Sequence, residues 1–142
     1  MKNIFVLSAL GFSCGLPYML VFSTLSAWLR DAGAALTVIG FISWAALTYS
    51  LKFLWSPFVD RIKMPLNQAV GQRRSWILMM QLLILILIMM MSQFDPISSL
   101  NFIVITAVLI AFFGSLQDIA VDAYRIELVS LDEQGNLAAS YQ

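Results

Sequence analysis

Four long stretches of apolar residues, almost free of charge, constrain this chain more than any other feature of its sequence. They cover about residues 4–27, 36–58, 76–94 and 100–121. A helix needs about 20 mainly apolar residues to cross roughly 30 Å of hydrocarbon, and it pairs its own backbone groups where no water is available. Each stretch therefore predicts one membrane-spanning helix. The predicted fold class is all-α, a polytopic transmembrane helix bundle of about four spans.

The composition excludes several classes of function. Hydrophobic residues make up 61% of the 142 residues and charged residues 11%, whereas an average soluble domain has about 25% charged residues. The absence of histidine removes a His-ligated metal, a Ser-His-Asp triad and a His proton relay from this chain. The one cysteine, Cys14, has no partner for a disulfide within the chain, and the net charge is zero. We therefore predict no metal site, no cofactor and no nucleic-acid partner.

Lysine and arginine are distributed unevenly between the two sides of the predicted bundle. With four spans, one side has Arg30, and the other side has Lys2, Arg61, Lys63, Arg73, Arg74 and Arg125. Short loops rich in lysine and arginine stay on the cytoplasmic side. The N-terminus, the loop of residues 60–74 and the C-terminal tail are therefore expected to be cytoplasmic.

Lys52 is the basic residue that falls inside a predicted span. One interpretation is a lysine whose ammonium reaches along the helix to the headgroups. The other is a cation in a cavity that attracts an anionic substrate or pairs with a carboxylate on another helix, because ionisable groups in a span usually face protein or water. The sequence leaves both interpretations open.

A second charged group follows Gln117 at the end of the fourth stretch. Asp118 and Asp122 are four residues apart and share a helix face, and Arg125 follows three residues later on the same side. Two carboxylates one turn apart compete for ionisation, while Arg125 would keep Asp122 charged. Asp118 is therefore the candidate for a proton-exchanging group. The alternative is that all three are ordinary charges at the membrane interface.

The loop after the second stretch combines an acid, bases and a glycine. Asp60 and Arg61 end the stretch, and Gly71, Arg73 and Arg74 precede the next one. Such residues can bridge helix ends, and the acid can also engage the positive N-terminus of a helix. A plain basic loop would explain the arginines but would not require Asp60 or Gly71.

The first stretch contains Gly11, Gly15 and Pro17. Small residues at this spacing let helices approach closely, and a proline frees a backbone carbonyl that can face a cavity. The pattern predicts a kinked, closely packed helix, and packing alone is the alternative to a role in a transport path.

In this order the motifs resemble those of a known transporter family. The loop resembles the signature between the second and third helices of the major facilitator superfamily. Phe53-Leu54-Trp55-Ser56-Pro57 before Asp60-Arg61, Gly71-x-Arg73-Arg74-x-Trp76, and Gln117-Asp118-Ile119-x-x-Asp122-Ala123 are similar to the AmpG muropeptide permease family. Gly11-Phe12-x-x-Gly15-Leu16-Pro17 and Ala27-Trp28-Leu29 fit the same family. The resemblance covers nearly the whole chain.

The resemblance implies a transporter rather than an enzyme. Its implied activity is proton-coupled import of GlcNAc-anhydro-N-acetylmuramyl peptides across the bacterial inner membrane for cell-wall recycling, with the lipid bilayer, the muropeptide and protons as partners. It also assigns a cytoplasmic gating motif, Asp60, Arg61, Gly71, Arg73 and Arg74. The residues that would line or close the cytoplasmic mouth are Lys52, Gln117, Asp118, Asp122 and Arg125.

Major facilitator proteins resemble one another in having twelve or more spans, and both halves enclose the cavity. We therefore expect residues 1–142 to be the N-terminal portion of a longer carrier that needs its C-terminal half, with Leu137-Ala138-Ala139 fitting the start of a fifth span after residue 136. The alternatives are an acetyl-CoA-type or other major facilitator carrier and a truncated, non-transporting membrane protein. A membrane-embedded enzyme is a further alternative, because Asp118-x3-Asp122 is similar to the acidic end of alcohol phosphatidyltransferases, although their upstream Asp-Gly-x-x-Ala-Arg is absent.

Overall fold

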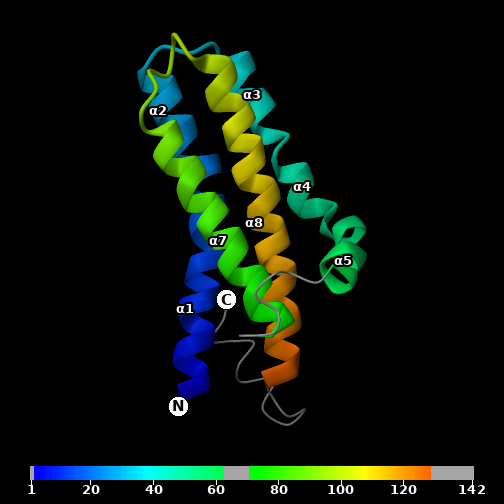
Figure 1. The fold of residues 1–142 in the computed structure, drawn as a ribbon. Helices are drawn as coiled ribbons and strands as arrows, with labels where there is room; N and C mark the ends of the chain where they lie inside the picture. The colour runs from blue at the N-terminus through cyan, green and yellow to red at the C-terminus, as the bar shows by residue number, and fades with distance from the viewer. Residues whose placement is uncertain (1, 63–70, 129–142) are drawn as a thin grey trace.

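The computed structural model describes residues 2–62 and 71–128, and all of its regular elements within these ranges are helices (Figure 1). The all-α prediction is confirmed. Lys63, the middle of the loop that follows the second span, and the stretch after residue 136 lie outside the described residues.

The first span is one long rod that changes its hydrogen-bonding pattern near the middle. It consists of α1 (Lys2–Met19), a π-helical turn η1 (Leu20–Thr24) and α2 (Leu25–Asp31). Pro17 lies inside α1 and has no N–H, so the carbonyl of Ser13 receives no helical hydrogen bond from it. The wider π-helical turn begins three residues later and often marks functional sites in helices.

The second span is broken. It consists of α3 (Leu36–Ser43), α4 (Ala46–Ser50) and α5 (Lys52–Arg61), and the axis bends by 53° at the break before Lys52. Figure 1 shows α5 diverging from the rest of the bundle. The break matters for function because it places Lys52 on the first turn of a separately oriented helix.

The third and fourth spans form the centre of the bundle. Helix α7 (Gln72–Met91) and helix α8 (Leu100–Leu128) are antiparallel neighbours, and α1, α4 and α5 also pack against α8. Over its apolar window α8 is 56% buried, compared with 33% for α7 and 22% for the first span. Helix α8 is therefore the central element on which the other helices are placed.

Two clusters of buried apolar side chains hold the helices together. One joins α1, α5, α7 and the C-terminal half of α8, with Val59, Trp76, Met80 and Ala120 among its members. The other joins the opposite ends of the same spans, with Leu29, Ile42, Ile103 and Ile110 among its members. Large apolar side chains such as Phe41, Leu85 and Ile105 are exposed on the outside, as expected for a surface that faces lipid.

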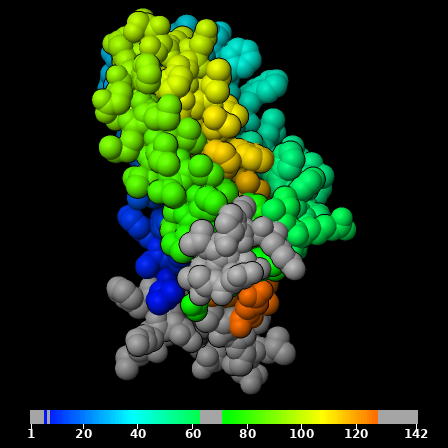
Figure 2. All heavy atoms as spheres, in the orientation of Figure 1, coloured from blue at the N-terminus to red at the C-terminus, as the bar shows by residue number. Residues whose placement is uncertain are grey.

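The helices differ from the predicted stretches at their ends. Within residues 2–62 and 71–128, three helices are long and apolar enough to cross a membrane, and the bent α3–α5 unit makes a fourth if it counts as one span. Helix α7 begins at Gln72 rather than near residue 76, and α8 continues to Leu128 rather than ending near residue 121. Arg73, Arg74, Asp122 and Arg125 are therefore helical. In Figure 2, α7 and the first half of α8 lie side by side on the visible face.

Candidate functional site

The predicted polar residues gather on and around the C-terminal half of α8. The end of the bundle where α5 ends, α7 begins and α8 ends is called the basic end below. An ion-pair triad and a helix-end cluster lie at or near the basic end, and a set of amide and hydroxyl side chains lies deeper in the bundle.

The triad joins α5 to α8. Lys52 Nζ lies 2.7 Å from Asp118 Oδ2 and 3.2 Å from Asp122 Oδ2. Because Asp118 and Asp122 are one turn apart on α8, a single ammonium reaches both carboxylates. Of the two interpretations of Lys52, the structure therefore supports pairing with carboxylates on another helix.

The triad is partly open to its surroundings. The side chains of Lys52, Asp118 and Asp122 are 40%, 23% and 35% exposed. One ammonium against two carboxylates leaves a net charge of −1 when all three groups are ionised. A net negative, partly accessible group at this depth can bind a proton or another cation.

The helix-end cluster ties the ends of α5, α7 and α8 together. Arg73 Nη1 donates a short hydrogen bond to Asp60 Oδ1, and Arg73 Nε lies 3.1 Å from Glu127 Oε1. Gln72 Nε2 donates to the backbone carbonyls of Val59, at 3.3 Å, and Asp60, at 2.8 Å, near the C-terminus of α5. Carbonyls of the last helical turn lack helical partners, so Gln72 acts as a cap supplied by another helix.

Gly71 holds the backbone conformation that starts α7. Its φ of 88° and ψ of 157° lie in a region that is essentially reserved for glycine. The Gly71 carbonyl accepts hydrogen bonds from the backbone N–H and the hydroxyl of Ser75, at 3.0 and 2.8 Å. This geometry gives a physical reason for a glycine two residues before the paired arginines.

Among the described residues, the other arginines of the basic end do not form the ion pairs that Arg73 forms in the helix-end cluster. Arg74 Nε donates to Tyr124 Oη at 3.1 Å, and its guanidinium lies 5.4 Å from the centre of the Tyr124 ring. Arg125 is half-buried near the end of α8, and Arg61, the last residue of α5, is exposed. Within the described part of the chain, Arg61 forms no ion pair, so the structure does not bring it into the helix-end cluster.

Gln117 lies away from the acids that follow it in the sequence. It is 1% exposed, and its Nε2 lies 3.2 Å from Ser13 Oγ and 3.6 Å from Cys14 Sγ. Gln81 Nε2 on α7 lies 2.7 Å from the same Ser13 Oγ. Consecutive helix positions differ by about 100°, so Gln117 faces α1 and α7 whereas Asp118 faces α5.

Gly15, one of the two glycines predicted to pack the first helix, is not in tight contact in the described part of the chain. A Cβ at Gly15 would meet nothing within 4 Å, and Gly11 is half-buried. The close approach occurs instead at Gly114 on α8, where a Cβ would overlap the hydroxyl of Tyr49 and lie 3.5 Å from Pro17 Cβ. Pro17 is buried at this crossing of the first span and α8.

Several residues that take part in these contacts were not singled out from the sequence: Ser13, Tyr49, Gln72, Gln81, Gly114, Tyr124 and Glu127. Gln81 carried a signal, because it is a polar residue near the middle of a uniformly apolar stretch. Tyr124 and Glu127 carried none, because their role depends on how far α8 continues. Across residues 2–62 and 71–128, no three acidic or cysteine side chains come together in a way that could hold a metal ion.

Several proteins with similar sequences are named transporters or permeases. Residues 3–142 match the family described as acetyl-coenzyme A transporter 1. The chain is 40% identical to the anhydromuropeptide permease of Escherichia coli K12 over 134 residues, which are 94% of this chain and 27% of that protein. It is 37% identical to putative transporter AmpG 4 of Rickettsia felis over 132 residues, which are 93% of this chain and 32% of that protein. The chain thus spans roughly three tenths of the length of these relatives, and the resemblance to AmpG permeases is confirmed.

Proposed function

We propose that this chain, which belongs to the acetyl-coenzyme A transporter 1 family, supplies the first membrane-spanning helices of a carrier that imports anhydromuropeptides together with protons. The cargo would be GlcNAc-anhydro-MurNAc peptides moving from periplasm to cytoplasm across a bacterial inner membrane for cell-wall recycling. The basic end and the N-terminus would face the cytoplasm. Support comes from the apolar helices and from relatives named as permeases and transporters.

The main support for proton coupling in this proposal is the triad of Lys52, Asp118 and Asp122. Its net charge of −1 inside a span is unfavourable, and one proton on a carboxylate removes that charge. Protonation would also weaken the ion pair that holds α5 against α8. Proton binding and a change in helix packing would then be linked through the same contact. Asp118 is the proposed proton-exchanging residue because it is the less exposed of the two acids and the farther from Arg125 along α8.

The helix-end cluster is proposed to be the cytoplasmic gate. Asp60, Arg73 and Glu127 come from three different helix ends, so separating those ends breaks both ion pairs. Exposed ion pairs contribute about 0–1 kcal/mol each. Contacts of this strength can hold one conformation and still open on every transport cycle.

Four spans cannot enclose a cavity on both sides, so alternating access requires further helices. The relatives are about three times as long as this chain, and we propose that it corresponds to the first third of a carrier of that kind. The activity belongs to the complete carrier, and this chain contributes one wall of the path.

An acetyl-CoA-type carrier is the second candidate, because the matched family is described in those terms. The charges of the triad favour the first candidate. Acetyl-CoA bears several phosphate charges, and the one ammonium of the triad is already shared by two carboxylates. A polyanion would therefore find no unshared ammonium within the triad.

The test measures uptake of a labelled anhydromuropeptide by cells that express the gene with its complete reading frame. Uptake should fall to background with a protonophore. The D118N variant should show the same low uptake without one, while still exchanging labelled for unlabelled muropeptide, because exchange needs no net proton movement. D31N, which removes an exposed carboxylate at the opposite end of the bundle, is the matched control and should transport normally.

Three outcomes would distinguish a coupling role of Asp118 from a structural defect and the first candidate from the second. Normal concentrative uptake by D118N would remove Asp118 from coupling. Loss of both uptake and exchange would indicate a structural defect rather than a coupling defect. Uptake of labelled acetyl-CoA, without uptake of labelled muropeptide, would favour the second candidate.

A further inference from the structure

Three aromatic rings from two spans meet where the first span contacts α4. Tyr18 on α1 and Phe22 in η1 are four residues apart and share a helix face, and their ring centroids are 4.7 Å apart. The Tyr49 ring on α4 lies 5.5 Å from the Tyr18 ring and 6.4 Å from the Phe22 ring. These separations are typical of packed aromatic pairs. The three residues are called the aromatic cluster below.

Tyr18 is the exposed member of the aromatic cluster. It is 46% exposed, whereas Phe22 and Tyr49 are half-buried. The Tyr18 and Tyr49 rings are nearly perpendicular, at 89°, so the edge of one ring meets the face of the other. Tyr49 is held in turn on its other side, where its hydroxyl lies against Gly114 of α8. The Tyr18 ring is therefore fixed from behind and keeps an uncovered surface.

The depth of Tyr18 is unfavourable for a side chain that faces lipid. Along the first span it lies about 24 Å from Lys2 and about 20 Å from Asp31, at roughly 1.5 Å per residue. Tyrosine prefers the two membrane interfaces, where its hydroxyl meets water or headgroups. The Tyr18 hydroxyl forms no hydrogen bond with any residue in the described part of the chain, and a lipid chain offers it no partner. An exposed tyrosine at this depth indicates polar surroundings.

The aromatic cluster and the triad are neighbours along the second span. Tyr49 lies three residues before Lys52, on the other side of the helix break. Both α4 and α5 pack on α8, which carries Asp118 and Asp122. The uncovered ring and the charged triad therefore belong to the same wall, which the proposed function assigns to the transport path.

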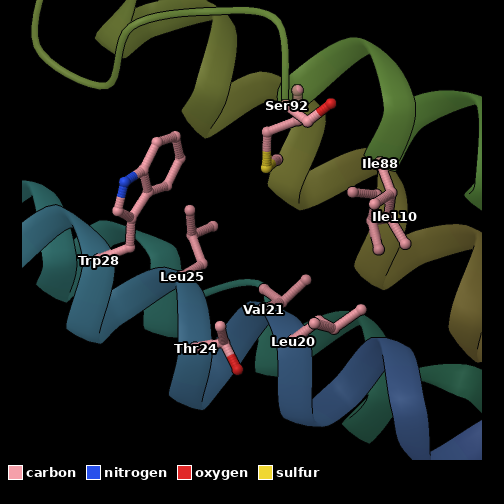
Figure 3. Close-up of a pocket in the computed structure, with 9 residues that line it drawn as sticks. Leu20, Val21, Thr24, Leu25, Trp28, Ile88, Ser92 and Ile110 are labelled. Atoms are coloured by element: carbon pink, nitrogen blue, oxygen red, sulfur yellow. The ribbon is translucent and has the colours of Figure 1, made fainter.

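A different side of the first span lines the pocket of about 350 Å³ that Figure 3 shows. There Val21 and Leu25 face Ile88 and Ile110, and most of the lining side chains are aliphatic. A sugar carries many hydroxyl and amide groups, and burying them without hydrogen-bond partners is unfavourable. This pocket is therefore a poor match for a sugar, and the uncovered surface of Tyr18 is the better one.

The chemistry of the proposed cargo contains one ring that suits a flat aromatic surface. In a β-linked N-acetylglucosamine ring the polar substituents point outward around the edge, so each face of the ring consists of C–H groups. Such a face can lie flat on an aromatic ring, and weak hydrogen bonds from its C–H groups to the ring contribute to the contact. In the anhydro-N-acetylmuramyl ring the internal bridge turns substituents onto the faces, so neither face is flat.

We propose that Tyr18 is the stacking surface for the N-acetylglucosamine ring of the cargo, and that its hydroxyl forms a hydrogen bond to a polar group of the same molecule. Phe22 and Tyr49 are positioning residues, because they hold the Tyr18 ring without reaching the sugar. A few polar groups on a largely apolar surface commonly orient a small molecule in this way. The inference rests on the proposed function for the identity of the sugar, but not on proton coupling.

Uptake kinetics of the carrier, expressed from its complete reading frame, test the role of Tyr18. Tyr18→Leu keeps an apolar side chain but removes the ring, so it should raise KM for labelled muropeptide about tenfold and leave the maximal rate within about twofold. Tyr18→Phe keeps the ring and should raise KM by about threefold at most, through the lost hydrogen bond. Phe41→Leu removes a 61% exposed ring from the surface that faces lipid, and as the matched control it should leave KM unchanged.

Two results of these kinetics would overturn the inference. If Tyr18 packs against another helix instead, leucine preserves an apolar contact, and KM of Tyr18→Leu should equal that of the parent. An equal rise in KM for Tyr18→Phe and Tyr18→Leu would show that the hydroxyl, and not the ring, makes the contact.

A binding measurement separates the stacking surface from transport. The probe is the methyl β-glycoside of N-acetylglucosamine, observed by saturation-transfer NMR with the purified carrier. Saturation should reach the axial hydrogens of the sugar in the parent and in Tyr18→Phe, and most of it should be lost in Tyr18→Leu. This signal without muropeptide uptake would support the stacking surface and count against the proposed function. Uptake with a KM that Tyr18→Leu leaves unchanged would overturn the stacking surface alone.

Discussion

The contact between Gly114 and Tyr49 predicts whether an alanine at residue 114 stabilises or destabilises the protein. A methyl group at residue 114 would overlap Tyr49 Oη, whereas the next nearest atom of that side chain, Cζ, would lie 3.4 Å away. The obstacle is therefore the hydroxyl rather than the ring. Tyr49 Oη is buried and has no hydrogen-bond partner among the described residues, so removing it leaves no polar group unpaired.

Two opposing effects set the magnitude of Gly114→Ala. Forcing an extra methyl group into a packed interior costs about 1–3 kcal/mol. Replacing glycine by alanine within a helix contributes about 1 kcal/mol in the other direction. In the unaltered background we therefore expect a net destabilisation of about 0–2 kcal/mol. In the Tyr49→Phe background the overlap is absent, and the same change should stabilise by about 1 kcal/mol.

The assay is thermal unfolding of the purified carrier in detergent for both single variants, the double variant and the parent. At about 1 °C per kcal/mol for a carrier about three times as long as this chain, the alanine should lower Tm by up to about 2 °C beside tyrosine and raise it by about 1 °C beside phenylalanine. Gly40→Ala is the matched control, because a Cβ there meets nothing within 4 Å, and its effect should not depend on Tyr49.

An equal fall in Tm in both backgrounds would refute this reasoning, because the obstacle would then not be the Tyr49 hydroxyl. Tyr49 also lies three residues before Lys52 on the other side of the helix break. A displacement of α4 by the alanine should therefore reduce uptake, and Tyr49→Phe should restore it.

Two further predictions concern the turns at the ends of α7. Gly71→Ala should destabilise the carrier by about 1–3 kcal/mol, because φ of 88° with ψ of 157° is strained for any residue with a Cβ, and a Tm no lower than that of Gly40→Ala would contradict this. Hydrogen bonds from the Ser98 backbone N–H, the Ser98 hydroxyl and the Ile97 N–H lower the pKa of Asp95 below its ordinary value. Since the folded-state pKa lies below the unfolded-state pKa, the stabilisation is complete above the unfolded-state value and is lost as the pH falls through the folded-state value. A carboxyl ¹³C titration should therefore give Asp95 a midpoint below that of an unstructured aspartate, and an ordinary midpoint would contradict the turn geometry.

Helical periodicity and apolar length determined much of the architecture in advance. An apolar stretch of about 20 residues has few alternatives to a helix in a membrane, so the all-α fold followed from composition and length. The shared face of Asp118 and Asp122 was likewise predictable, because a spacing of four residues fixes the relative direction of two side chains on one helix. Helix ends were less predictable. The extension of α8 to Leu128 brings Glu127 to Arg73, and neither residue signals that contact in the sequence.

Partnerships between helices needed the tertiary structure. The sequence placed Lys52 inside a span but left its partner open, and the break before α5 with the packing of α5 on α8 selected Asp118 and Asp122. The sequence also grouped Gln117 with the acids, whereas the structure turns it toward Ser13 on α1. Local spacing determines which residues share a face of one helix. The neighbour that each face meets depends on crossing angles and breaks that are set by the packing of the whole bundle.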